Sequence, residues 1–289
     1  MKIIRTVTEM QNTSLKLKRD GNTIGFVPTM GFLHEGHLSL IRRARGECDI
    51  LVVSIYVNPT QFAPGEDIDK YPRDIDRDER LCEEEGVDII FYPTDEEMYP
   101  EGYLTEVRVK RLGEILCGVS RPTHFAGVTT IVSKLFNIVM PDIAVFGQKD
   151  AQQAVIIRRM TLDLNFPVKI IVSPTVRESD GLAMSSRNAY LSEKEREIAP
   201  ALYRSLCLAE KMIKSGKGYD AIEIIVKMRK SILTAGPFDI DYIEIVDAET
   251  LEPVENPAGK DVLIALAARL GKTRLIDNII VGKSKSKLK

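Results

Sequence analysis

Residues 24–40, IGFVPTMGFLHEGHLSL, constrain the fold more than any other part of this 289-residue chain. The apolar run 24–27 predicts a buried strand that Pro28 ends, and Met30-Gly31 predicts a tight turn. From Leu38 onward, apolar residues recur at helical spacing with arginines between them. A strand, a glycine-bearing turn and a helix start together present unpaired backbone N–H groups to an anion. The segment therefore predicts an α/β unit with an anion-binding turn.

His34 and His37 stand at the start of this predicted helix, at a spacing that points both imidazoles the same way. Each imidazole can donate a hydrogen bond to a phosphate oxygen. The alternatives are two surface histidines on an ordinary α/β unit, or part of a metal site. No third Cys or His lies nearby in the sequence, and two histidines alone make a poor zinc site. Because the pair follows a strand and opens a helix, we interpret it as a nucleotide-phosphate site.

Composition limits the remaining possibilities. The net charge of −2 argues against a general nucleic-acid binder, and no apolar run reaches the ~18 residues of a membrane span. The 4 cysteines are scattered without a C-x-x-C pair, which argues against a disulfide framework and fits a reducing cytosol. The N-terminus lacks the apolar core of a signal peptide. We expect a cytoplasmic protein whose lysine-rich end, residues 282–289, is a solvated tail.

Strand-like and helix-like segments alternate up to residue 174, which predicts a Rossmann-like doubly wound parallel sheet over residues 1–174. The pattern then changes, and residues 175–289 predict a smaller C-terminal α+β domain. There we expect two helices and three antiparallel strands, at 193–214, 219–233, 240–246, 262–268 and 275–281. Between these elements, residues 93–100 predict an acidic loop, and most of the charged run 67–78 predicts a solvated face.

Two further segments combine a turn with groups that bind phosphate. Residues 147–150, Gly-Gln-Lys-Asp, follow a predicted strand; Lys149 offers a positive charge and Asp150 a partner for a ribose hydroxyl. Residues 184–187, Met-Ser-Ser-Arg, offer two hydroxyls and a guanidinium. Taken alone, residues 147–150 are more simply interpreted as a turn with a surface cation, and residues 184–187 as a polar interdomain loop. The carboxyl edge of the predicted sheet, where ligands bind, favours the functional interpretation of Lys149.

Uncharged and cationic groups elsewhere suit a second substrate. The side-chain amides of Gln61 and Gln153 can hydrogen-bond a substrate hydroxyl or carboxylate. Without further context, a glutamine is more often an ordinary surface residue. Arg121 and His124 form a third cationic loop, for which helix capping is an equal alternative. The chain has no G-x-S-x-G, no G-x-x-x-x-G-K-[ST] and no G-x-G-x-x-G motif, which argues against hydrolase, Walker-type and dinucleotide redox chemistry.

Seven segments in register resemble the pantoate–β-alanine ligase (pantothenate synthetase) family over nearly the whole chain. They are FVPTMGFLHEGH (26–37), SIYVNPTQF (54–62), YPRD (71–74), RPTHFAGV (121–128), FGQKDAQQ (146–153), DGLAMSSRNAYLS (180–192) and TRLIDN (273–278). The H-x-G-H turn and the M-S-S-R loop also resemble the signatures of the wider nucleotidylyltransferase superfamily.

The resemblance implies that Mg-ATP activates pantoate as a pantoyl-adenylate, which β-alanine converts to pantothenate and AMP on the route to coenzyme A. It implies a homodimer with a C-terminal lid domain, and catalytic roles for His34, His37, Lys149 and Arg187. It places pantoate and β-alanine near Gln61, Gln153, Asn58 and Arg121. It assigns ATP binding to Met30, Gly31, Phe32, Leu33, His34, Glu35, Gly36, His37, Gly147, Gln148, Lys149, Asp150, Val176, Met184, Ser185, Ser186 and Arg187.

The resemblance leaves open whether Asp74, Asp76 or Asp78 approaches the Mg²⁺, or whether phosphates and water alone hold it. Two rival functions differ from a ligase. A nucleotidylyltransferase that acts on a phosphate substrate would need cations where Gln61 and Gln153 stand. A non-catalytic, synthetase-like RNA-binding or scaffold module would be expected to lose the phosphate-binding side chains, which this sequence retains.

Overall fold

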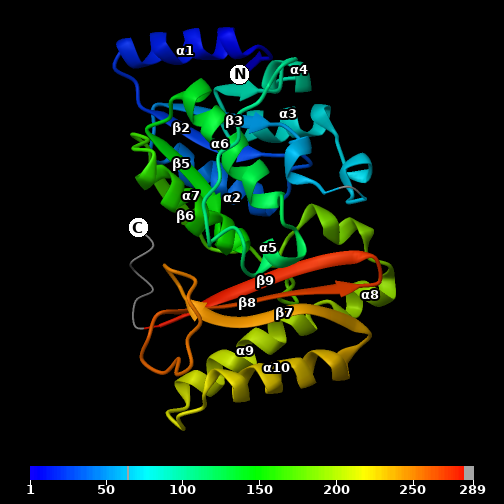
Figure 1. The fold of residues 1–289 in the computed structure, drawn as a ribbon. Helices are drawn as coiled ribbons and strands as arrows, with labels where there is room; N and C mark the ends of the chain where they lie inside the picture. The colour runs from blue at the N-terminus through cyan, green and yellow to red at the C-terminus, as the bar shows by residue number, and fades with distance from the viewer. Residues whose placement is uncertain (64, 283–289) are drawn as a thin grey trace. The chain divides into compact units, whose positions relative to one another are not determined.

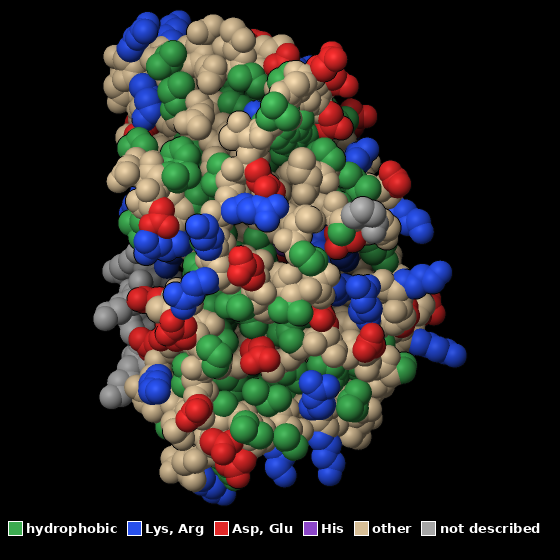
Figure 2. All heavy atoms as spheres, viewed as in Figure 1, with side chains coloured by type: hydrophobic (Ala, Val, Ile, Leu, Met, Phe, Trp, Pro, Cys, Tyr) green, Lys and Arg blue, Asp and Glu red, His purple; other side chains and the backbone are tan. Residues whose placement is uncertain are grey.

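The computed structural model describes residues 1–63 and 65–282, so the tail expected at residues 283–289 lies outside the described residues. The chain forms two compact units. One consists of Met1–Gly147 and Gln153–Ser173, and the other of Gln148–Gln152 and the residues from Pro174 onward. Within the described part of the chain, no helix has the length and apolar character needed to cross a membrane. Figure 2 shows basic and acidic side chains interspersed over the face in view.

The N-terminal unit is built on a six-stranded parallel sheet with the order β1-β4-β3-β2-β5-β6. The order reverses between β2 and β5, and ligands of open α/β sheets bind at the carboxyl ends of the strands at such a switch point. The predicted doubly wound sheet is confirmed. Its strands are β1 (Lys2–Ile4), β2 (Ile24–Thr29), β3 (Ile50–Ile55), β4 (Ile89–Phe91), β5 (Ile143–Gly147) and β6 (Lys169–Ser173).

Helices cover both faces of this sheet (Figure 1). On β3, Val52 packs in the core with α1, α6 and α7, whereas Leu51 and Val53 pack in the core with α2 and α3, because successive strand residues point to opposite faces. The helices are α1 (Val7–Arg19), α2 (Glu35–Arg45), α3 (Ile75–Glu84), α4 (Asp95–Met98), α5 (Cys117–Ser120), α6 (His124–Val139) and α7 (Ala151–Asp163), with short 3-10 helices η1 (Pro59–Gln61) and η2 (Ile68–Lys70).

Two expectations for this unit were wrong. Pro28 does not end its strand, because β2 continues to Thr29 beside β3. β5 pairs with β2 only at Gly25 and Phe26. Beyond Phe26, β2 is hydrogen-bonded on one side, to β3, so Pro28 can lie in the strand although it has no N–H. The expected acidic loop contains α4, which Thr94 caps by accepting from the backbone amide of Glu97.

The C-terminal unit is an antiparallel sheet in the order β7-β8-β9 with helices packed against it (Figure 1). The apolar sides of the helices and the sheet share one core, in which Leu206, Ile232 and Ile264 are fully buried. The predicted antiparallel strands are confirmed. The elements are η3 (Gln148–Asp150), η4 (Ser186–Tyr190), α8 (Glu193–Ile198), α9 (Ala201–Lys214), α10 (Ala221–Ala235), β7 (Phe238–Asp247), β8 (Val262–Leu270) and β9 (Thr273–Val281).

The helix expected over residues 193–214 is two helices, α8 and α9. Pro200 is the N-cap of α9. Proline has no N–H for the helix ladder, so the run of helical hydrogen bonds is interrupted here.

Candidate active site

The turn that follows β2 does not present the unpaired backbone amides expected of it. The amide of Gly31 donates to the Thr29 hydroxyl, and those of Phe32 and Leu33 donate to Asp78. Gly31 has φ +80°, and a Cβ there would lie 2.9 Å from Ile55 Cγ2 and 3.0 Å from Asp78 Oδ2. Phe32, at φ 50°, also adopts the left-handed conformation. Only glycine fits the first position without strain. The two left-handed residues reverse the chain and lead it into α2.

A buried carboxylate holds this turn. Asp78 on α3 accepts hydrogen bonds of 2.7 Å from the backbone amides of both Phe32 and Leu33. Its side chain is 1% exposed. Burial raises the pKa of Asp78, although these two amide donors act in the opposite direction. Arg77 adds a 2.7 Å hydrogen bond to the Leu33 carbonyl. The helix α3 therefore fixes the backbone just before the two histidines.

Sequence reasoning missed Asp78, because it lies in the charged run that predicted a solvated face. A signal was present: Asp78 follows Ile75 by three residues and precedes Cys82 by four, which is the spacing of one helix face. Cys82 is fully buried, as that face predicts. A carboxylate on the apolar face of a helix requires a buried partner.

His34 and His37 form a reciprocal cap at the start of α2. His34 Nδ1 accepts a hydrogen bond from the Gly36 amide at 3.1 Å, and His37 Nδ1 accepts one from the His34 amide at 3.3 Å. The ring centroids are 4.0 Å apart. Because each Nδ1 is an acceptor, a neutral ring carries its proton on Nε2. Both imidazoles are thereby set as Nε2–H donors, and the predicted convergence of the pair is confirmed.

Gln61 lies close to this turn, at the end of η1. Its Nε2 donates to Met30 Sδ at 2.8 Å, and its Oε1 accepts from Asn58 Nδ2 at 3.2 Å. Asn58 is 1% exposed, and its amide also donates to the Gly127 carbonyl. A Cβ at Gly127 would lie 2.4 Å from the Thr60 carbonyl oxygen, so α6 approaches η1 this closely only through a glycine.

Arg121 and His124 both contact the backbone of Gln61. Arg121 donates to the Gln61 carbonyl at 3.2 Å and forms a two-fold ion pair with Glu66. His124, at the first position of α6, places Nδ1 2.9 Å from the same carbonyl. Burial favours the neutral form of Glu66, but the Arg121 guanidinium outweighs it and holds the pKa of this carboxyl below its ordinary value. These two side chains therefore support the Gln61 loop. Gln153, in the first turn of α7, is half-buried.

The remaining candidate residues belong to the C-terminal unit, apart from Gly147 at the end of β5. Lys149 lies in η3 with its side chain 22% exposed, and its Nζ is 3.8 Å from Asp150 Oδ1. Val176 accepts a hydrogen bond from the Met184 amide at 3.0 Å, which closes a short hairpin. Ser185 caps η4 by accepting from the Arg187 amide, and Ser186 is buried. This hairpin carries the Met184–Arg187 segment as one piece.

The structure thus brings the candidate residues together in two groups, each within its own unit. The histidine turn, Met30 and the Gln61 loop form the first group. Lys149, Val176 and the Ser185–Arg187 segment belong to the second. Among residues 1–63 and 65–282, no three His, Cys, Asp or Glu side chains are grouped to hold a metal ion.

The fold and the turn define a class: a Rossmann-like α/β protein with a rigid, glycine-bearing turn and two histidines at the switch point of its sheet. The sequence model of the pantoate-beta-alanine ligase family matches residues 2–280. A pantothenate synthetase from Caldicellulosiruptor bescii is 57% identical over 281 residues, which is 97% of this chain and 99% of the relative. The chain belongs to the pantoate–β-alanine ligase family.

Solved structures agree with this assignment. The pantothenate synthetase from Thermus thermophilus superposes with a TM-score of 0.92 at 46% identity, covering 98% of this chain and 100% of that one. The pantoate-beta-alanine ligase from Francisella tularensis, crystallised in complex with "Beta-gamma ATP" and β-alanine, gives a TM-score of 0.80 at 35% identity, covering 97% of each chain. The resemblance inferred from the sequence and the predicted fold class are confirmed.

Proposed function

We propose that this chain is an ATP-dependent ligase that joins (R)-pantoate to β-alanine, giving pantothenate, AMP and pyrophosphate. Membership of the pantoate–β-alanine ligase family supports the reaction. The Francisella relative with ATP and β-alanine in its title supports two of the three substrates. The observation that carries the proposal furthest is the His34–His37 cap, because it orients two donors at the switch point where such sheets bind nucleotides.

The proposed reaction has two steps. A carboxylate oxygen of pantoate attacks the α-phosphorus of ATP, the bond to the β-phosphate oxygen breaks, and pyrophosphate leaves. The β-alanine amine then attacks the acyl carbon of the pantoyl-adenylate and loses a proton, and AMP leaves with the oxygen that joined it to the acyl group. The second step requires a shielded adenylate and an aligned amine rather than a nucleophilic side chain.

In the first step, negative charge develops on the departing pyrophosphate. The Nε2–H donors of His34 and His37 suit those oxygens, as do the Lys149 ammonium, the Ser185 and Ser186 hydroxyls and the Arg187 guanidinium. Residues 30–37, 147–150, Val176 and 184–187 would together hold ATP. Mg²⁺, when bound, neutralises phosphate charge. Mg²⁺ is commonly held by substrate phosphates and water with one or two carboxylates, and we name no protein ligand for it.

The pantoate site is proposed around Gln61 and Gln153, whose amides can donate to a carboxylate and accept from a hydroxyl. The contacts of Asn58 and Arg121 suit them to fixing the Gln61 side chain and backbone. We further propose that the protein acts in the cytoplasm as a homodimer, and that residues 1–174 and 175–289 are a substrate-binding domain and a lid.

One assay tests the function. Purified protein receives Mg-ATP and pantoate, with and without β-alanine, and AMP and the product mass are measured. We expect AMP and a product of pantothenate mass only when the amine is present. Pyrophosphate without amine dependence would point to a different acceptor. Failure to bind ATP at all would favour the non-catalytic module.

A further inference from the structure

The strand β9 carries two adjacent polar residues that are almost fully buried, Asp277 at 4% and Asn278 at 3% exposure. They end the motif TRLIDN, to which the proposed reaction gives no task. Buried polar side chains are costly unless their hydrogen bonds are made. The groups to which Asp277 and Asn278 hydrogen-bond therefore indicate the role of each side chain.

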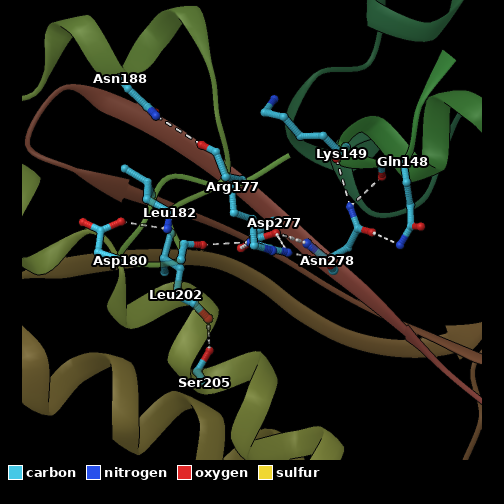
Figure 3. A network of polar contacts seen from close by, with 12 residues as sticks. Gln148, Lys149, Arg177, Asp180, Leu182, Asn188, Leu202, Ser205, Asp277 and Asn278 are labelled. Atoms are coloured by element: carbon cyan, nitrogen blue, oxygen red, sulfur yellow. Dashed lines mark hydrogen bonds and ion pairs between the residues drawn. The ribbon is translucent and has the colours of Figure 1, made fainter. Parts of the chain in front are cut away.

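Asn278 makes its hydrogen bonds with the turn that carries Lys149 (Figure 3). Its Nδ2 donates to the carbonyls of Gln148 and Lys149, at 3.0 and 2.9 Å. Its Oδ1 accepts from Gln148 Nε2 at 3.4 Å. Two carbonyls in succession require two donors from one side chain. An amide supplies them, whereas a carboxylate of the same shape would direct lone pairs at both oxygens.

These bonds fix the backbone from which the Lys149 side chain extends. The 3.8 Å separation between Lys149 Nζ and Asp150 Oδ1 is longer than a hydrogen bond, so Asp150 does not anchor the ammonium in this way. The backbone of Gln148 and Lys149 sets the point from which the ammonium extends. Asn278 is the side chain that holds both of their carbonyls.

Asp277 secures the strand beside this contact. It forms a two-fold ion pair with Arg177, at 2.7 and 2.9 Å. Arg177 also donates to the backbone carbonyls of Gly181 and Asn278, and its guanidinium lies 3.8 Å from the centre of the Tyr203 ring. The stretch that precedes Met184 is thereby attached to β9 as well (Figure 3).

We propose that Asn278 is a positioning residue for the adenylation step: it sets the Lys149 ammonium at the phosphates of ATP by holding the carbonyls of Gln148 and Lys149. This inference rests on the proposed function, since it assigns Asn278 a part in that reaction. A purely structural role would lower stability without acting through Lys149, and the two possibilities give different kinetics.

The test is a double-mutant cycle on the full chain, read as the rate of pyrophosphate release from ATP and pantoate. Asn278→Ala is expected to lower the rate constant about 10- to 100-fold, the cost of a misplaced group. In the Lys149→Ala background, the same change is expected to lower it less than about two-fold, because the group through which Asn278 acts is gone. Asn278→Asp, of equal size, should lose at least as much as Asn278→Ala.

The matched control is Ile232→Val, which removes one methylene from a fully buried side chain of the same unit. It should lower the melting temperature and leave the rate constant unchanged. Equal losses from Asn278→Ala with and without Lys149 would overturn the inference, as would wild-type rates in both Asn278 variants. A wild-type protein that forms no pantothenate would overturn the proposed function itself, and the inference with it.

Discussion

The backbone amide of Leu33 donates a 2.7 Å hydrogen bond to Oδ1 of Asp78, a carboxylate 45 residues further along the chain. The amide beside it, that of Phe32, donates to the other oxygen of the same carboxylate. The turn before the two histidines thus takes its shape from α3 as well as from its own glycine. Asp78 therefore influences where the histidines stand through the backbone of the two residues before them.

Asp78→Ala should damage both stability and ATP use. It leaves two backbone amides without their acceptor, at about 1–3 kcal/mol for each that stays buried and unpaired. We expect a lower free energy of unfolding in urea and a weaker apparent affinity for ATP. Glu84→Ala, an exposed position in the last turn of the same helix, is the control and should change neither. Unchanged ATP use by a folded Asp78→Ala protein would contradict the assigned role.

The ion pair of Glu66 with Arg121 should make part of the stability depend on pH. Because the folded-state pKa of Glu66 lies below its ordinary value of about 4.3, its stabilisation is fully present above that value. It is lost as the pH falls through the folded-state pKa. At pH 7 the free energy of unfolding of Glu66→Gln should therefore be lower than that of wild type by about 1 kcal/mol. Urea unfolding of both proteins, measured over a range of pH, tests this. The free energies of unfolding should become equal in acid, and a difference that stays constant at every pH would contradict the assignment to the ion pair.

The two nitrogens of His37 can be separated by substitution. Glutamine places its amide N–H near the position of Nε2, whereas asparagine places its oxygen near Nδ1, the atom that accepts from the His34 amide. His37→Gln should therefore keep more adenylation activity than His37→Asn. Loss of the Nε2–H donor should cost about 10²–10³ in rate. A His37→Asn protein as active as wild type would show that the donor is not needed.

Substitution of Gln61 should affect pantoate more than ATP. Gln61→Ala removes an amide near the proposed pantoate site, and the KM for pantoate should rise several-fold more than the KM for ATP. Gln61→Glu, of equal size, should be worse because its charge repels the substrate carboxylate. Steady-state kinetics with each substrate varied in turn measure both effects. Equal increases in the two KM values would contradict a specific role for Gln61 in binding pantoate.

Local patterns were sufficient to predict most of the fold. The apolar run at β3 and the 3.6-residue spacing of α6 are properties of neighbouring residues, so they can be recognised without the structure. Pro28 and Pro200 show the limit. One proline continues a strand and the other separates two helices, and the difference depends on the pairing around each, which lies outside the local sequence.

The candidate site could be predicted where a motif carries its own geometry, as His34 and His37 do three residues apart. The supporting residues were harder to find. Asp78 and Asn278 act on segments far away in the sequence, and each looks ordinary in its own stretch. In the sequence, such a residue can be recognised only as a polar side chain at a position where the pattern predicts an apolar one. That signal is clear for Asp78 on its helix face.

The central claim is that pantoate is activated as an acyl-adenylate, and oxygen transfer tests it most directly. The protein is supplied with Mg-ATP, β-alanine and pantoate whose carboxylate oxygens are ¹⁸O, and the mass of the released AMP is measured. Attack by the carboxylate on the α-phosphorus predicts one heavy oxygen in each AMP. Unlabelled AMP formed together with labelled pantothenate would contradict the account, because the carboxylate would then never have been joined to the nucleotide.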